Sequence, residues 1–179
     1  MKRLLILFSF IASSLVLAGQ NSEAIDELFQ KYEGKDGITS VKISSKMLSM
    51  FSNSDEKGKN DDDLNNIFSK LKSIRILTVE DSTLNLKLNF YEELRKKADF
   101  SKYEELMVVN EADGTTKFLI MQSGKKISEL LIISGGKKGN TLISISGDLD
   151  LKNISELSGK MGIQQLQELD KLDKKNQKE

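Results

Sequence analysis

The sequence predicts an α+β fold: a mixed sheet of about six strands that ends in a four-strand antiparallel meander, with helices packed mainly on one face. Two observations lead to this fold class. Residues 104–149 hold four apolar runs separated only by short breaks rich in Gly and Lys. Before them, two segments rich in β-branched residues alternate with amphipathic segments of helical period.

The predicted meander comprises the apolar runs at 106–109, 118–121, 127–133 and 142–145. The breaks between them are Asp113-Gly114, residues 124–126 and residues 135–140. Asp-Gly and Gly-Gly supply the positive backbone angles that a tight hairpin needs. Residues 130–133 are apolar at every position, so we expect them to form an interior strand.

Residues 1–19 resemble a secretory signal peptide. Lys2 and Arg3 precede an apolar stretch at 4–17, which Ala18 and Gly19 follow. The apolar stretch is short for a membrane span, and an uncleaved anchor is the alternative. A lipoprotein would carry a Cys after the small residues, where Gln20 stands. We therefore expect cleavage after Ala18 or Gly19, a periplasmic or secreted protein, no lipid anchor and no stable membrane span after cleavage.

The first half of the mature chain is expected to fold as helix, strand, helix, helix and strand. Residues 22–33 have an apolar stripe of helical period, 38–44 alternate like a strand, and 46–51 suit a short helix. The very polar residues 52–63 indicate a solvated loop whose last Asp residues cap a helix over 64–71. A second strand is expected at 73–80.

Residues 84–98 suit either a strand or a helix, and their helix-forming residues favour a helix from about Leu86. After the meander, Asp150 is expected to cap a short helix that Gly159 ends. A last amphipathic stripe follows in the tail. The predicted organisation is a signal peptide (1–19), one α+β domain (20–162) and an amphipathic and polar tail (163–179), which packs on the domain or binds a partner.

Composition restricts the chemistry open to this chain. Its 179 residues include no His and no Cys, so the common general base, the thiol nucleophile and the usual zinc ligands are missing. Removing Lys2 and Arg3 leaves 25 basic and 27 acidic residues, a formal charge of 25 − 27 = −2. Lys residues are interleaved with acidic ones, which disfavours a nucleic-acid partner.

Two groups of carboxylates are candidates for a metal ion or for acid/base chemistry. Asp148 and Asp150 are two positions apart, and Asp61 and Asp63 lie in an acidic run. For the first pair, a turn at Asp148 and a helix cap at Asp150 explain the residues better. For the second pair, the spacing lacks the pattern of a calcium loop. We therefore assign no catalytic residue, no cofactor and no metal site.

Several short phrases resemble an uncharacterised family of exported bacterial proteins, catalogued as domain of unknown function 4252. They are residues 29–37 (FQKYEGKDG), 74–78 (IRILT), 103–107 (YEELM), 127–130 (ISEL), 146–150 (SGDLD) and 154–157 (ISEL). The resemblance implies export and small size, and a lipoprotein form in some relatives. The family that it resembles is also associated with genes near envelope sigma and anti-sigma factors. It implies no activity and no catalytic residues.

The sequence therefore favours an exported, non-catalytic protein that binds a partner protein or a small ligand in the cell envelope, in an envelope-stress regulon. Two alternatives stay open. One is a hydrolase or lyase that uses Asp and Glu, which requires a cleft where two carboxylates converge. The other is a carrier of an apolar ligand, which requires an apolar cavity.

Overall fold

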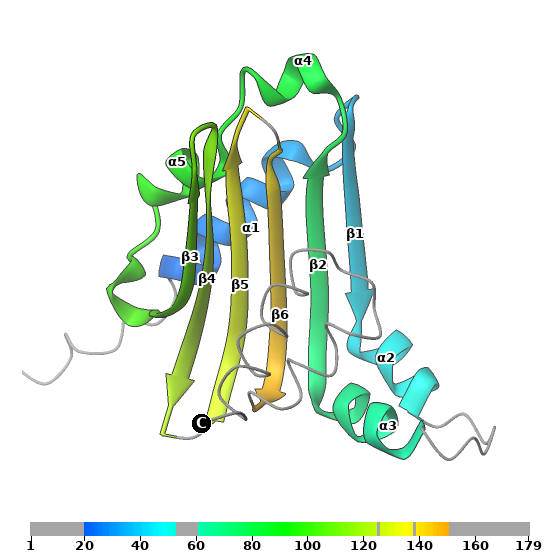
Figure 1. The fold of residues 1–179 in the computed structure, drawn as a ribbon. Coiled ribbons are helices and arrows are strands. Elements are labelled where there is room, and N and C mark those ends of the chain that lie inside the picture. Colours follow the sequence, from blue (N-terminus) through cyan, green and yellow to red (C-terminus); the bar gives the residue numbers. More distant parts are fainter. Residues whose placement is uncertain (1–19, 53–60, 125, 138, 151–179) are drawn as a thin grey trace, which may run out of the picture.

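One six-stranded sheet organises the computed structural model, which describes residues 20–52, 61–124, 126–137 and 139–150 (Figure 1). The strands are β1 (Ile38–Ser44), β2 (Leu71–Val79), β3 (Glu104–Glu111), β4 (Gly114–Ser123), β5 (Lys126–Gly136) and β6 (Thr141–Leu149). Their order across the sheet is β1-β2-β6-β5-β4-β3. The free edges of the described sheet are therefore β1 and β3.

The α+β class and the meander are confirmed, because β3, β4, β5 and β6 are neighbours in chain order. The sheet differs from the expected mixed sheet in one respect, which is that every pair of neighbouring strands is antiparallel. The reason is the position of β2, which lies between β1 and β6 and runs opposite to both. The predicted strand at 38–44 matches β1.

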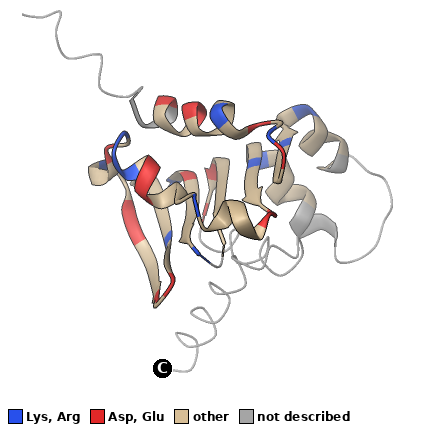
Figure 2. Ribbon diagram, turned by 90° about the horizontal axis from the view of Figure 1, so that it is seen from above, with Lys and Arg blue, Asp and Glu red and all other residues tan. Residues whose placement is uncertain are grey.

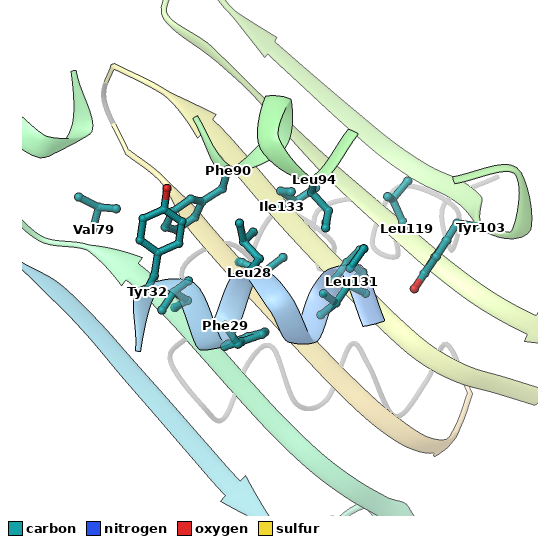
Figure 3. Packing of buried hydrophobic residues seen from close by; sticks show 14 residues of the cluster. Leu28, Phe29, Tyr32, Val79, Phe90, Leu94, Tyr103, Leu119, Leu131 and Ile133 are labelled. Atoms are coloured by element: carbon teal, nitrogen blue, oxygen red, sulfur yellow. The ribbon is translucent and has the colours of Figure 1, made fainter. Parts of the chain in front are cut away.

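Two helices, α1 (Gln20–Tyr32) and α5 (Phe90–Arg95), cover one face of the sheet, which we call the helix face. A short helix, α4 (Ser82–Asn85), lies at the end of the strands (Figure 1). Leu28 and Phe29 of α1 pack with Phe90 and Leu94 of α5 in a buried cluster that also includes side chains of β2, β4, β5 and β6 (Figure 3). The apolar stripe of α1 explains why this helix lies flat on the strands.

The opposite face of the sheet carries a second buried cluster. It includes Ile74, Leu130, Ile132 and Ile145, each 0% exposed. The helices α2 (Ser45–Ser52) and α3 (Asp61–Lys70) contribute to it and contact β2 and β6. Because β5 is buried on both faces, the expectation that residues 130–133 form an interior strand is confirmed.

The segment 84–98 is neither a strand nor a helix from Leu86. It forms two short helices, with α4 ending at Asn85 and α5 beginning at Phe90. Two polar side chains set these boundaries: Asp81 accepts a hydrogen bond from the Leu84 N–H at 2.7 Å, and Asn89 accepts one from the Glu92 N–H at 2.9 Å. N-caps of this kind stabilise a helix start by about 1 kcal/mol, which favours new helices at these two positions.

Residues 135–140 were expected to act only as a break between two strands. Gly135 and Gly136 instead extend β5, and Asn140 is fully buried. The Asn140 Oδ1 atom accepts the Phe90 N–H at 2.9 Å, and Nδ2 lies within hydrogen-bond distance of oxygens of Asn85, Leu88 and Gly136. Asn140 therefore ties the β5–β6 turn to both short helices.

The predicted signal peptide, the cap at the start of the helix after Asp150 and the amphipathic tail concern residues 1–19 and 151–179, which lie outside the described residues. The same holds for residues 53–60 of the polar loop.

Candidate binding groove

A groove lies between α1 and the edge strand β1, with a cavity volume of about 220 Å³. We call it the α1–β1 groove. Its walls combine charged, polar and apolar residues: Asp26, Phe29, Gln30, Glu33, Ser40, Val41, Lys42 and Arg75. The helix supplies one wall and β1 the other, with Arg75 from β2 between them.

The local sequence explains this arrangement. Asp26 and Gln30 are four positions apart on the side of α1 that borders the groove, and Glu33 directly follows the helix, while Ile25 and Leu28 are buried against the sheet. In β1, Ser40 and Lys42 alternate with Val41, so Ser40 and Lys42 lie on the helix face. Figure 2 shows acidic and basic residues together along α1, which lies as a layer over the sheet.

Arg75 is the central residue of the groove. Its guanidinium forms an ion pair with Asp26 and lies over the Phe29 ring, 4.6 Å from the ring centroid. The Arg75 side chain is 20% exposed, so this pair is partly shielded from water. Stacking and an ion pair together fix the planar guanidinium in one orientation.

A hydrogen-bonded network lies beside Arg75 on the same face of the sheet. Arg75 is opposite Ser144 of β6, whose hydroxyl donates to Glu129 Oε1 at 2.7 Å. The Tyr103 hydroxyl donates to the other carboxylate oxygen of Glu129, also at 2.7 Å. We call Tyr103, Glu129 and Ser144 the Glu129 network. It joins β5 and β6 to the residue that directly precedes β3, on the helix face.

The electrostatics of this network keep its tyrosine protonated. Burial raises the pKa of Tyr103 far above its ordinary value, and the neighbouring Glu129 carboxylate raises it further. The positive charge of Arg75 acts in the opposite direction but is outweighed. Tyr103 is therefore a hydrogen-bond donor to Glu129 at any physiological pH and not a general base.

The carboxylates that the sequence offered as metal candidates do not line the α1–β1 groove. Asp148 lies in β6 and not in a turn, and its Oδ2 atom is 2.7 Å from Lys126 Nζ. The hydrogen bond from Lys126 lowers the pKa of Asp148. Asp150 follows the end of β6, and Asp61 and Asp63 lie at the start of α3. Among the described residues, no three His, Cys, Asp or Glu side chains are grouped to hold a metal ion.

Sequence reasoning missed Arg75 and Glu129, although a signal for both was present. Each is a charge on a strand that has a leucine two positions further along the same face, Leu77 for Arg75 and Leu131 for Glu129. A charge on a face destined for burial needs a partner. The partners themselves, Asp26 and Tyr103, are 49 and 26 positions away and follow only from the fold.

A family model described as Domain of unknown function (DUF4252) matches residues 32–157, which is more than half of the chain. The chain belongs to this family. The family range begins at the end of α1 and includes all six strands, so the groove is formed by the DUF4252 sheet together with a helix that mostly precedes the matched range. No curated protein and no solved structure matches the chain. No helix in the described part of this DUF4252 protein is long and apolar enough to cross a membrane.

Proposed function

We propose that this protein is an exported, non-catalytic binding protein of the cell envelope, which recognises an extended polypeptide segment of a partner. The observation that carries this proposal is the position of the α1–β1 groove beside the free edge of β1. An edge strand offers backbone hydrogen bonds to an added strand, and a neighbouring pocket reads alternate side chains of that strand. Export and a role in an envelope-stress regulon belong to the same proposal and rest on the sequence.

The size of the groove favours a polypeptide side chain over a whole small ligand. Pockets for drug-sized molecules measure roughly 300–1,000 Å³, and the α1–β1 groove has about 220 Å³. Its walls carry Asp26, Glu33, Lys42 and Arg75, which disfavours an apolar ligand in this place. A polar or charged side chain with an aliphatic stem suits such a lining.

The geometry of the Glu129 network favours binding over hydrolysis. The Ser144 hydroxyl and the Glu129 carboxylate are placed like a nucleophile and a base, at 2.7 Å. However, Ser144 is only 1% exposed, so a substrate carbonyl has no access to its Oγ atom. Both oxygens of Glu129 are already hydrogen-bonded, which gives the network a structural role in joining β5 and β6 to the segment before β3.

Photo-crosslinking in living cells tests the proposal. A photoreactive amino acid replaces Gln30, which is exposed at the groove, in the full-length protein. The control replaces Thr115, on β4 beside the other edge strand. We expect a discrete adduct in the envelope fraction with the Gln30 probe and none with the Thr115 probe. The proposal fails if the Gln30 probe gives no adduct, or if both probes give the same one.

The mass of the protein purified from the envelope tests the export step separately. We expect the mass of a chain that begins at Gly19 or Gln20. A full-length mass in the cytoplasmic fraction would refute export without bearing on the groove.

A further inference from the structure

We propose that the strand added to β1 is β1 of a second copy of this chain. The two strands pair antiparallel with Val41 opposite Val41 of the second copy, and each Lys42 enters the groove of the other copy beside Glu33. This inference rests on the proposed function, because it names the partner that the α1–β1 groove binds. The resulting symmetric dimer has one continuous sheet and two completed grooves.

The backbone of β1 is free on the side where the second copy would pair. The Glu80 N–H donates to the Gly37 oxygen, and Gly37 and Glu80 continue the β1–β2 register. Hydrogen-bonded pairs alternate along an antiparallel ladder, so Thr39, Val41 and Ile43 bond to β2. The N–H and C=O groups of Ser40 and Lys42 therefore point away from the sheet.

The register follows from symmetry and length. A twofold axis between antiparallel copies of one strand places a residue opposite itself, and Val41 is the middle of the seven-residue strand Ile38–Ser44. Pairing about Val41 joins all seven residues and sets Ser40 opposite Lys42 of the second copy, both with outward backbone groups. Pairing about Lys42 would instead bring two like charges together, which is unfavourable.

Charge complementarity supports the same register. Lysine in the middle of an edge strand usually prevents pairing with another chain. Here Lys42 and Glu33 both line the groove, and neither has an ion pair within the described residues. Because Lys42 of the second copy lies opposite Ser40, which also lines the groove, its ammonium group reaches the wall that carries Glu33. The dimer would thus contain two ion pairs, each between Lys42 of one copy and Glu33 of the other.

Three of the four exposed large hydrophobic side chains among the described residues lie in this edge strand or in the helix that follows it. The exposed large hydrophobic residues of the described chain are Val41, Met47, Met50 and Leu86. Val41 lies in β1, the two methionines follow β1 in α2, and Leu86 directly follows α4. Burial of Val41 between the two copies adds to the strand hydrogen bonds.

Disulfide crosslinking between two copies tests the proposed β1–β1 register directly. The chain has no Cys, so a single introduced thiol reports one position without ambiguity. Opposed residues of a non-hydrogen-bonded antiparallel pair have Cα atoms about 4.5 Å apart, a spacing that a disulfide accepts. We expect Val41→Cys to form a covalent dimer under mild oxidation. The matched control, Val109→Cys, is on the other edge strand and the same face of the sheet, and we expect it to stay monomeric.

Sedimentation of charge and backbone variants tests the interface in the full mature chain. Lys42→Glu and Glu33→Lys alone should each give a monomer, and the double variant Glu33→Lys/Lys42→Glu should restore the dimer. Ser40→Pro should give a monomer because it removes an outward N–H, whereas Ser40→Ala should remain a dimer. Circular dichroism of each variant shows that the fold is retained.

The outcomes separate this inference from the proposed function. A monomeric wild type that still gives a Gln30 adduct with a different protein overturns the dimer and keeps the binding function. A monomeric wild type with no Gln30 adduct overturns both. A dimer that the Lys42 and Ser40 variants leave unchanged places the contact elsewhere and overturns the β1 interface.

Discussion

At the scale of single residues, the stability of the helix face depends on hydrogen bonds between polar groups that are buried or partly buried. Glu129 is the clearest case, because its carboxylate is partly removed from water on the face that carries the apolar cluster of Leu119 and Leu131. The Tyr103 and Ser144 hydroxyls compensate for that loss. A charge that is partly removed from solvent is tolerated only while such hydrogen bonds are present.

Tyr103→Phe should therefore destabilise the protein by about 2 kcal/mol, since it leaves one oxygen of a partly buried carboxylate without its donor. Urea unfolding at neutral pH measures this loss. Glu129→Gln and the double variant Tyr103→Phe/Glu129→Gln complete a double-mutant cycle. The losses of stability caused by the two single substitutions should be strongly non-additive. Additive losses would mean that the two side chains do not interact in solution.

The same hydroxyl predicts how stability depends on pH. The pKa of Tyr103 is raised in the folded state above the ordinary value of 10.0. The folded protein therefore keeps a proton that the unfolded chain releases, so this stabilisation is complete below about pH 10 and is lost as the pH rises further. Above pH 10, the free energy of unfolding of the wild type should fall more steeply than that of Tyr103→Phe. Tyr32, whose pKa is also raised, is present in both proteins and cancels in the difference. Parallel curves would contradict the assignment.

Asn140→Ala should cost at least about 2 kcal/mol, because it leaves the buried Phe90 N–H without an acceptor and removes the donor to Asn85 and Leu88. Thermal unfolding measures the effect. Thr115→Ala, which removes only an exposed hydrogen bond to Asn110, is the control and should change stability little. Equal effects of the two changes would mean that Asn140 is not the tie between the β5–β6 turn and the short helices.

Among the elements, the positions of the strands could be predicted because each strand contains a run of apolar or β-branched residues with polar, charged or glycine residues on either side. The helices α4 and α5 were predicted less accurately. Each begins at a single capping residue, Asp81 or Asn89, within a segment whose leucines alternate as in a strand. The α1–β1 groove could not be predicted from the sequence. It requires α1 and β2 side chains, Asp26 and Arg75, that meet only after the sheet has formed.

Close approach of elements also explains Gly135, which hairpin chemistry alone does not. A Cβ atom at Gly135 would lie 2.2 Å from Asn89 Oδ1 and 2.9 Å from the Tyr91 backbone nitrogen, at the start of α5. Gly135→Ala should therefore push α5 off the sheet and cost about 1–3 kcal/mol. Gly139→Ala is the matched control, since a Cβ there meets nothing within 4 Å. Urea unfolding should separate the two variants clearly, and equal stabilities would show that α5 does not pack this closely.

For the molecule as a whole, the decisive property is that β5 and β6 are buried on both faces. The two apolar clusters share no residue, but β5 and β6 contribute side chains to both. A substitution that disrupts the packing of one cluster therefore also destabilises the other. This is why an all-antiparallel sheet here carries continuous apolar runs instead of the usual alternation of apolar and polar residues. The edge strands β1 and β3 are more polar, which leaves them available for contacts outside the domain.

Ile132→Asp should therefore prevent folding of the entire domain and not only of one face. Ile132 is 0% exposed in the interior strand β5, opposite Phe118 of β4 and Ile143 of β6, and none of these can pair a carboxylate. Far-ultraviolet circular dichroism and the loss of a cooperative melting transition measure the effect. Ile132→Val keeps the apolar surface and should cost only about 0.5–1.5 kcal/mol. Ser128→Asp places the same charge on an exposed position of the same strand and should fold. A native melting curve for Ile132→Asp would mean that water reaches the centre of the sheet, and with it that the two apolar layers do not close over β5.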